Sequence, residues 1–264
     1  MSAPRLQTPA LSPILLVGRG RVSGALRRAA LAAALEVRAA GRADGAELAR
    51  GCEVALLCVP DAEISAASAA LADAAPELRF VGHASGASTL AAVEPSRGSG
   101  ASTFSLHPLQ TIPDGETDLV GCPAAIAGSD QAALGLAREL AERLGMRPFE
   151  VPEESRAGYH AAASIASNLL VTLESSAVEL LDAAGVANPD EARELLTPLV
   201  LRTASNWAER GPAALTGPVA RGDEATLDRH REAIAERAPE LAPLYEALVE
   251  RTREIAASGH EARA

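Results

Sequence analysis

Residues 14–24 read Ile-Leu-Leu-Val-Gly-Arg-Gly-Arg-Val-Ser-Gly, and this stretch decides the fold. Its first four residues form a short, purely apolar run rich in β-branched and aliphatic side chains, which is typical of a buried strand. Gly18 ends the run, and residues 22–34 that follow have the composition of a helix. The stretch therefore predicts a strand, a glycine turn and a helix in succession.

The glycine spacing within this turn is that of a dinucleotide-binding fingerprint, with Ser23 at the third glycine position and Gly24 just after it. The first two glycines permit a tight turn and a close approach of a pyrophosphate, which the helix N-terminus then stabilises. A glycine turn without any ligand is the alternative. The residues expected to contact the cofactor here are Gly18, Arg19, Gly20, Arg21 and Val22.

The end of the second predicted strand favours NADP over NAD. Sites that prefer NAD usually carry an Asp or Glu about 20 residues after the turn, where it holds the ribose hydroxyls. Here the chain has Arg42 instead, with Arg38 and Arg19 as helpers. Arginines can neutralise a 2′-phosphate through charge-assisted hydrogen bonds, so we expect NADP (NADPH) as the cofactor. The alternative is that these arginines are merely solvated.

Strand-like and helix-like segments alternate through the first half of the chain, and strand signals almost vanish after Ala157. Alternation of this kind implies parallel βαβ units. The predicted fold class is therefore α/β: a doubly wound parallel sheet of the Rossmann type, followed by an all-helical C-terminal domain. The expected divisions are a flexible N-terminal tail (1–12), a cofactor-binding domain (13–152) and a helical substrate and dimerisation domain (153–264). Further strands are expected at 35–38, 54–59, 79–82, 103–106 and 124–127.

Composition restricts the possible functions. The formal net charge of the 264 residues is −11, which disfavours nucleic acid and anionic membrane surfaces as partners. All 24 basic residues are Arg, so no mechanism that needs a catalytic lysine is possible. The three cysteines form no CxxC pair and suggest neither a disulfide framework nor a metal site. No run approaches the roughly 20 apolar residues of a membrane span, and we expect a cytoplasmic protein.

Polar groups follow several of the predicted strands, where ligands bind in open α/β sheets. The phrases are Val59-Pro60-Asp61, His83-Ala84-Ser85-Gly86 and His107-Pro108-Leu109-Gln110. We expect Val59, Pro60 and Ser85 to contact the cofactor. His107 is a candidate substrate contact and catalytic residue.

Together with the segment from Tyr159 to Asn168 and with Thr216-Gly217-Pro218, these phrases resemble a family of Rossmann-like oxidoreductases. The helical C-terminal half of that family is classed only as a domain of unknown function, and the resemblance runs from Ile14 to about Ile255. It implies an NADP-type first domain and a second domain similar to that of 6-phosphogluconate dehydrogenase and ketopantoate reductase. It supplies no substrate.

In those better-known relatives, a Lys and an Asn four residues later on one helix bind the substrate oxygen. Asn168 matches the Asn, but Ser164 stands at the Lys position. His160 precedes Ser164 by one helical turn and Asn168 by two, so all three are expected to face one cleft. Because imidazole titrates near neutral pH, His160 is the candidate general acid or base. A ligand contact without catalysis, or simple packing, is the alternative for this histidine.

The resemblance favours an NADP-dependent oxidoreductase that transfers hydride to or from a small carbonyl, hydroxy or imine substrate. A non-catalytic NADP-binding or sensing protein remains an alternative, because the lysine is missing and the third glycine is altered. Within the enzyme class, hydride exchange between NADP and a deazaflavin is a second alternative. A homodimer through the helical domain is expected.

Overall fold

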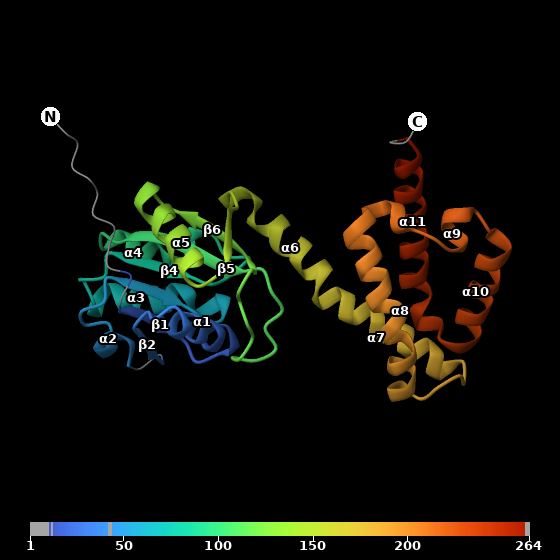
Figure 1. Cartoon of the computed structure of the whole chain (residues 1–264), viewed down its shortest axis with the longest axis horizontal. Helices are drawn as coiled ribbons and strands as arrows, with labels where there is room; N and C mark the ends of the chain where they lie inside the picture. Colours follow the sequence, from blue (N-terminus) through green and yellow to red (C-terminus); the bar gives the residue numbers. More distant parts are fainter. Residues whose placement is uncertain (1–10, 12, 42–43, 262–264) are drawn as a thin grey trace. The chain divides into compact units, whose positions relative to one another are not determined.

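The structure is a computed structural model that describes residue 11 and residues 13–41 and 44–261. It contains two compact units, Met1–Ile165 and Ala166–Ala264, which are described separately (Figure 1). The unit boundary lies later than the expected domain boundary at 152/153. Of the predicted tail 1–12, only Leu11 is described, and it is buried in the core rather than flexible and free.

The first unit is built on one seven-stranded sheet with the strand order β2-β1-β3-β4-β5-β6-β7. Neighbouring strands from β2 to β5 are parallel, β6 is antiparallel to β5, and β7 is parallel to β6. This is the predicted Rossmann-type sheet, with the strand order reversing at β1. The strands are β1 (Ile14–Val17), β2 (Val37–Ala40), β3 (Val54–Leu57), β4 (Phe80–His83), β5 (Ser102–Pro108), β6 (Pro123–Gly128) and β7 (Arg147–Glu150).

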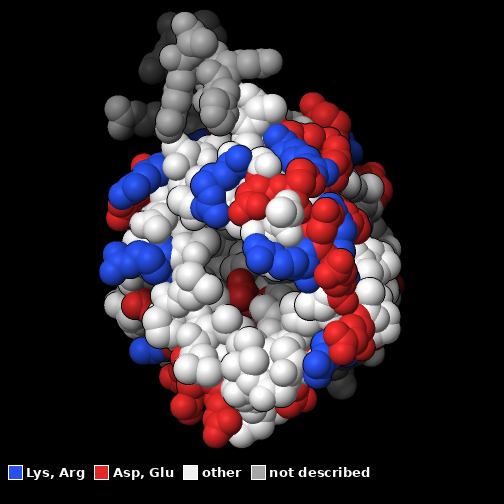
Figure 2. Space-filling model, turned by 90° about the vertical axis from the view of Figure 1, so that its right-hand side faces the viewer, with Lys and Arg blue, Asp and Glu red and all other residues white. Residues whose placement is uncertain are grey.

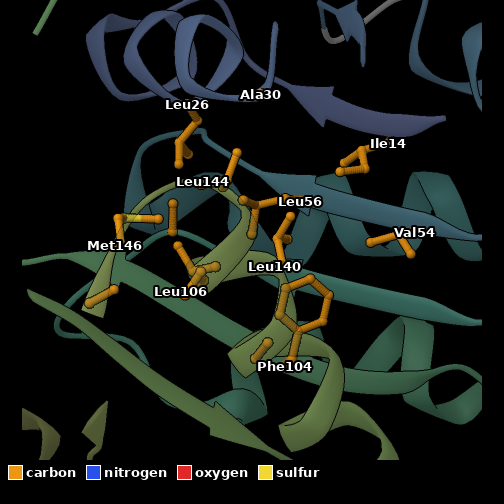
Figure 3. Close-up of a cluster of buried hydrophobic side chains, with 14 of the residues drawn as sticks. Ile14, Leu26, Ala30, Val54, Leu56, Phe104, Leu106, Leu140, Leu144 and Met146 are labelled. Carbon is orange, nitrogen blue, oxygen red and sulfur yellow. The ribbon is translucent and has the colours of Figure 1, made fainter. Parts of the chain in front are cut away.

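Both faces of the sheet are covered, which explains why its central strands are apolar without alternation. Along β1, Ile14 and Leu16 pack into one core, and Leu15 and Val17 pack into the other. Figure 3 shows the first core, where side chains of β1, β3 and β5 meet those of helices α1 and α5. Because successive strand residues point to opposite faces, one four-residue run serves both layers.

Helices α1 and α5 belong to the first core, and α3 belongs to the second. Asp130 caps the N-terminus of α5 by accepting a hydrogen bond from the amide of Ala133. The α-helices of the first unit are α1 (Arg21–Ala32), α2 (Gly45–Leu48), α3 (Ile64–Ala74), α4 (Glu94–Gly98), α5 (Gln131–Arg143) and α6 (Arg156–Ala166, of which the last residue falls in the second unit). Short 3₁₀ turns are η1 (Asp61–Glu63), η2 (Leu90–Val93) and η3 (Glu153–Ser155).

The second unit is helical throughout the residues that the structure describes, as predicted. A capping box at Asn188 and Glu191 starts its longest helix, and Gly217 and Gly222 flank the short α9 with positive φ values. The helices are α7 (Asn168–Ala183), α8 (Pro189–Arg210), α9 (Pro218–Arg221), α10 (Glu224–Arg237) and α11 (Ala242–Glu261), with 3₁₀ turns η4 (Gly211–Ala214) and η5 (Pro239–Leu241).

Acidic and basic side chains are interspersed on the face of the second unit shown in Figure 2. Several of them form ion pairs between α10 and α11, including Arg231 with Glu246 and Arg253 with Glu224. Nucleic-acid surfaces instead gather basic side chains on one face. This face therefore has no continuous basic area.

One helical stretch, Glu153–Ala183, is long and apolar enough to cross a membrane by length and composition alone, contrary to the expectation from the sequence. The mean hydropathy of its best window is 1.2, and none of that window is buried. Arg156 near its start is nevertheless buried against the sheet of the first unit. A single stretch of this kind does not establish a membrane protein.

Candidate active site

The glycine turn after β1 is held against the end of β3. Gly18 has a φ of +127°, and a Cβ built on it would lie 2.3 Å from the carbonyl oxygen of Cys58. Only glycine fits this position. Gly20 differs, because a Cβ built there meets nothing within 4 Å, so the backbone at Gly20 faces open space.

The N-terminus of α1 has the features of an anion site. Gly20 is the N-cap residue and supplies no side-chain cap, and the first turn holds no acidic residue. The first amides of the helix and its dipole are thus available to a phosphate. Arg19 and Arg21 are exposed beside them, whereas Val22 packs on the core and offers only its backbone. The turn therefore fits a dinucleotide pyrophosphate.

The altered third position of the fingerprint has a structural explanation. Ser23 is buried, and the close approach falls instead on Gly24, where a Cβ would lie 2.7 Å from the Cα of Gly115. Gly115 belongs to the long loop between β5 and β6. The absence of a side chain at Gly24 thus lets this loop, rather than a strand, pack closely against α1.

Of the arginines predicted near the end of β2, the structure describes Arg38 and Arg19, and they make different contacts. Arg38 donates to the carbonyl oxygens of Leu48 and Arg50 and pairs with Glu36, so it anchors α2 rather than facing the turn. Arg19 pairs with Asp44 at 2.9 Å, and Asp44 also accepts from the amide of Gly41. Arg42 lies outside the described residues. Among the residues that the structure describes, Arg19 reaches the end of β2 from the glycine turn.

The loop after β4 is stabilised by Ser85. Its hydroxyl oxygen accepts from the amides of Ala87 and Ser88, at 3.2 and 3.0 Å. Its hydroxyl hydrogen stays available for a ligand. Val59 packs on the second core, and Pro60 is exposed at the start of η1. The predicted cofactor contacts Val59, Pro60 and Ser85 follow β3 and β4, which are adjacent strands.

Three aromatic side chains meet at the carboxyl end of β5. His107 Nδ1 and the Tyr159 hydroxyl are 2.7 Å apart, and the His107 and His160 rings lie edge to face at 6.1 Å. A Cβ on Gly86 would lie 2.8 Å from both His107 Nε2 and His160 Nδ1. The two predicted histidines are thus neighbours, and a bare backbone at Gly86 makes room for both. Sequence reasoning missed Tyr159 and Gly86, because only the folded chain brings them to His107.

The electrostatics of this cluster favour neutral side chains. Burial, with smaller contributions from the neighbouring His160 and Arg156, lowers the pKa of His107 to about 4, while Asp61 acts in the opposite direction. Burial raises the pKa of Tyr159 to about 12. The Nδ1 atom of His160 is buried without a hydrogen-bond partner in the part of the chain that the structure describes. A buried polar atom of this kind is a position where a ligand or water is expected.

The single helix predicted for His160, Ser164 and Asn168 is divided in the structure, and Ser164 alone shares α6 with His160. Ser164 follows His160 by one turn of α6, but the helix ends at Ala166 and a new helix starts at Asn168. Ser167 between them leaves helical backbone, with φ −128° and ψ −83°. The spacing of one continuous helix therefore does not apply to Asn168, which lies in the second unit.

Elsewhere in the described part of the chain, the structure shows no metal site and one pocket away from the cluster. No three His, Cys, Asp or Glu side chains of the described residues are grouped to hold a metal ion. A pocket of about 400 Å³ lies between the second half of α1, residues 117–120 and the end of α5, and none of the predicted site residues lines it. The carboxyl ends of β4 and β5 remain the place where reactive side chains gather.

Residues 122–252 match the model of a family described as a domain of unknown function, DUF2520. The match begins directly before β6, inside the first unit, and runs into α11 of the second unit. No curated protein sequence matches the chain.

Solved structures share the fold over nearly the whole chain. A protein from Bacteroides fragilis, described as a "putative NADP oxidoreductase", is 23% identical with a TM-score of 0.73, over 92% of this chain and 98% of that one. A protein of Thermotoga maritima, TM1727, is 23% identical with a TM-score of 0.70, over 94% and 99%. The pyrroline carboxylate reductase of Plasmodium falciparum, solved with NADP bound, is 10% identical with a TM-score of 0.63, over 93% and 98%. These similarities establish the fold.

Proposed function

We propose that this protein is an NADP(H)-dependent reductase that transfers hydride to a small substrate with a C=N or C=O bond, or removes it from the reduced product. The carrying observation is the open glycine turn at Gly20 before the uncapped N-terminus of α1. NADP appears in the descriptions of two proteins of the same fold, one of them a pyrroline carboxylate reductase. Arg19, at the end of β2, is the described arginine best placed for a 2′-phosphate.

The cofactor would supply the hydride, and the protein would supply a proton and orientation. Reduction of a C=N or C=O bond also adds a proton to the nitrogen or oxygen. In our proposal the Tyr159 hydroxyl donates to His107 Nδ1 and the Nε2–H of His107 points to the substrate. As the Nε2 proton passes to the substrate, Nδ1 takes the proton of Tyr159, so that His107 stays neutral and the Tyr159 phenolate regains a proton from solvent. His160 stands beside this pair and contacts the substrate through its unpartnered Nδ1.

This assignment moves the proposed proton donor from His160 to the pair of His107 and Tyr159. The change rests on the 2.7 Å contact, which orients His107 in the way that a proton donor requires. Ser164 and Asn168, which were predicted as catalytic residues with His160, are assigned only a contact with the substrate in this proposal. Lysine chemistry is excluded by the sequence, so the neutral side chains of this cluster have to serve instead.

The test measures NADPH consumption with a panel of cyclic imines and small ketones, in the wild type and in the variants Tyr159→Phe and His107→Asn. We expect turnover to fall about 100-fold or more in His107→Asn, and less in Tyr159→Phe, while NADPH still binds both. His230→Asn is the matched control, because His230 contacts Tyr245 at 2.9 Å in the second unit in a similar pair. NADPH binding without turnover of any substrate would instead favour a sensing protein, and turnover only with a deazaflavin would favour that alternative.

We further propose that the protein is a homodimer in the cytoplasm. Residues 157–173 contain no Asp, Glu or Arg, and Ile165, Leu169, Leu170 and Val171 within them are exposed. Large exposed apolar areas mark interfaces, and a second copy would offer the same uncharged stretch across a two-fold axis.

Light scattering during gel filtration tests the dimer. We expect Val171→Glu to give a monomer, because burying the carboxylate against a second copy is costly. Val186→Glu, equally exposed but outside the stretch, should stay dimeric. A wild-type monomer would refute the dimer and leave the enzymatic proposal untouched.

A further inference from the structure

Arg156 is a fully buried arginine at the first position of α6, with only 1% of its surface exposed. Its guanidinium makes three contacts: Nε donates to Glu153 Oε1 at 3.2 Å, Nη1 donates to the carbonyl oxygen of Ser85 at 3.2 Å, and Nη2 donates to the hydroxyl of Ser105. The planar fork of an arginine is suited to such divergent contacts. The side chain thus joins α6 to the loop after β4 and to strand β5.

Glu153 extends this connection. Its second carboxylate oxygen accepts from the amide of Leu90 at 2.6 Å, in the turn that follows the β4 loop. Arg156 and Glu153 therefore tie together the loop after β4, strand β5 and the start of α6. A buried arginine, here paired with a glutamate at the edge of the solvent, is a costly way to attach a helix, since apolar side chains of similar size are often as stable. Its use here indicates a need for exact placement.

The contacts form two adjacent connections between β5 and α6. Ser105 and His107 are two residues apart on β5 and lie on the same side of the strand. Arg156 and Tyr159 are three residues apart on α6 and lie on the same face of the helix. Ser105 binds Arg156, and His107 binds Tyr159. The first connection fixes the register at which the second one forms.

We propose that Arg156 is a positioning residue, which holds α6 against β5 so that the Tyr159 hydroxyl meets His107 Nδ1 and His160 faces Gly86. Its role in catalysis rests on the proposed reductase function. The placement of Tyr159 and His107 can be tested without that function.

The charge of Arg156 has a second effect on the same cluster. The charged or titratable groups that act on His107 are His160, Arg156 and Tyr159 of α6, Asp61 of η1 and His83 of β4. Arg156 contributes to lowering the pKa of both His107 and His83, after burial. A buried cation that stays charged thus helps to keep two histidines neutral.

The experiment compares Arg156→Lys, Arg156→Met and Ser105→Ala with Arg97→Met as a control. Arg97 also forms an ion pair with a glutamate three residues earlier, but it is 58% exposed at its side chain. The readouts are the pKa of His107 and His83, followed by NMR of their ring carbons, and the kcat and KM of NADPH-dependent turnover.

Arg156→Met should raise the pKa of both histidines toward 6.5, whereas Arg156→Lys and Ser105→Ala should leave them low. Arg156→Lys and Ser105→Ala should both lower kcat, by about 10- to 100-fold for Arg156→Lys. The KM for NADPH should stay unchanged in both variants. If Arg156→Met does not fold, the kcat values of Arg156→Lys and Ser105→Ala still test the proposal. The proposal is overturned if the histidine pKa values and kcat of all folded variants match those of Arg97→Met. A wild type that binds no NADPH would refute the reductase instead, and the NMR titration would still decide the placement.

Discussion

The backbone of Gly18 lies against the carbonyl oxygen of Cys58, with no space for a side chain between them. The strand β1 and the strand β3 thus end in direct contact, and the turn that follows β1 is fixed by it. Gly20, two residues later, has free space in front of it. The two glycines of this motif therefore have different roles. Gly18 allows the close contact between the ends of β1 and β3, and Gly20 leaves space for a ligand.

Gly18→Ala is expected to lower the free energy of unfolding by about 2 to 4 kcal/mol, because it adds a clash to a backbone with positive φ. Gly20→Ala should cost less than about 1 kcal/mol, since its φ of −81° suits any residue. Urea unfolding of both variants measures the difference. Equal losses would show that Gly18 is not specially constrained.

Gly86→Ala is expected to separate the His107 and His160 rings. The new Cβ would lie 2.8 Å from a nitrogen of each, so at least one ring has to move. We expect turnover to drop about 100-fold, because a displacement near 1 Å is enough for such a loss. NADPH affinity should stay unchanged, and a variant with full turnover would remove His107 and His160 from the proposed site.

Stability should fall as the pH falls from about 6.5 to 4. Burial lowers the pKa of His83 and of His107 to about 4 in the folded protein, below the ordinary 6.5, so the unfolded chain binds more protons in this window. The stabilisation present above pH 6.5 is then lost at about 1.4 kcal/mol per pH unit for each histidine. Urea unfolding at a series of pH values measures the slope, and His107→Gln should reduce it by about half. A flat profile would mean that these histidines are accessible to protons in the folded state.

Arg19→Ala is expected to weaken NADPH binding about 10- to 100-fold, because a charge-assisted contact to the 2′-phosphate is lost. NADH, which lacks that phosphate, should bind as in the wild type. Arg38→Ala is the control, since Arg38 is occupied by the carbonyl oxygens of Leu48 and Arg50. Calorimetric titration with both nucleotides decides the matter. If NADPH and NADH weaken equally, Arg19 does not read the phosphate.

The sequence predicted the sheet well where local signals were strong. The runs predicted as strands at 14–17, 54–59 and 79–82 are short and ended by turn residues, and they overlap β1, β3 and β4. The edge strand β7 was missed, because Arg147-Pro148-Phe149-Glu150 is half exposed and carries no apolar run. Edge strands hydrogen-bond on one side only, so their side chains need not be hydrophobic.

The candidate site was predicted only in part, because its contacts join distant segments. His107 and His160 were chosen for their chemistry, but the pairing of His107 with Tyr159 spans 52 residues and has no local signature. Arg156 follows Glu153-Glu154-Ser155, a polar run that reads as surface, although the arginine is buried. The break at Ser167 was also hidden, since the Ala- and Leu-rich segments on both sides favour helix. At Tyr159 and Arg156, contacts with distant segments set the arrangement, and local preference could not predict it.

Thermal unfolding of the wild type and of Gly20→Ala, each with NADPH, NADH and no nucleotide, tests the central claim most directly. A ligand that binds only the folded state stabilises it, by about 2.7 kcal/mol at a concentration 100 times Kd. We predict that NADPH raises the Tm of the wild type more than NADH does, and that Gly20→Ala loses this increase while keeping the Tm of the free protein. No increase with either nucleotide, or the same increase in Gly20→Ala, would contradict the assignment of this turn as an NADP(H) site.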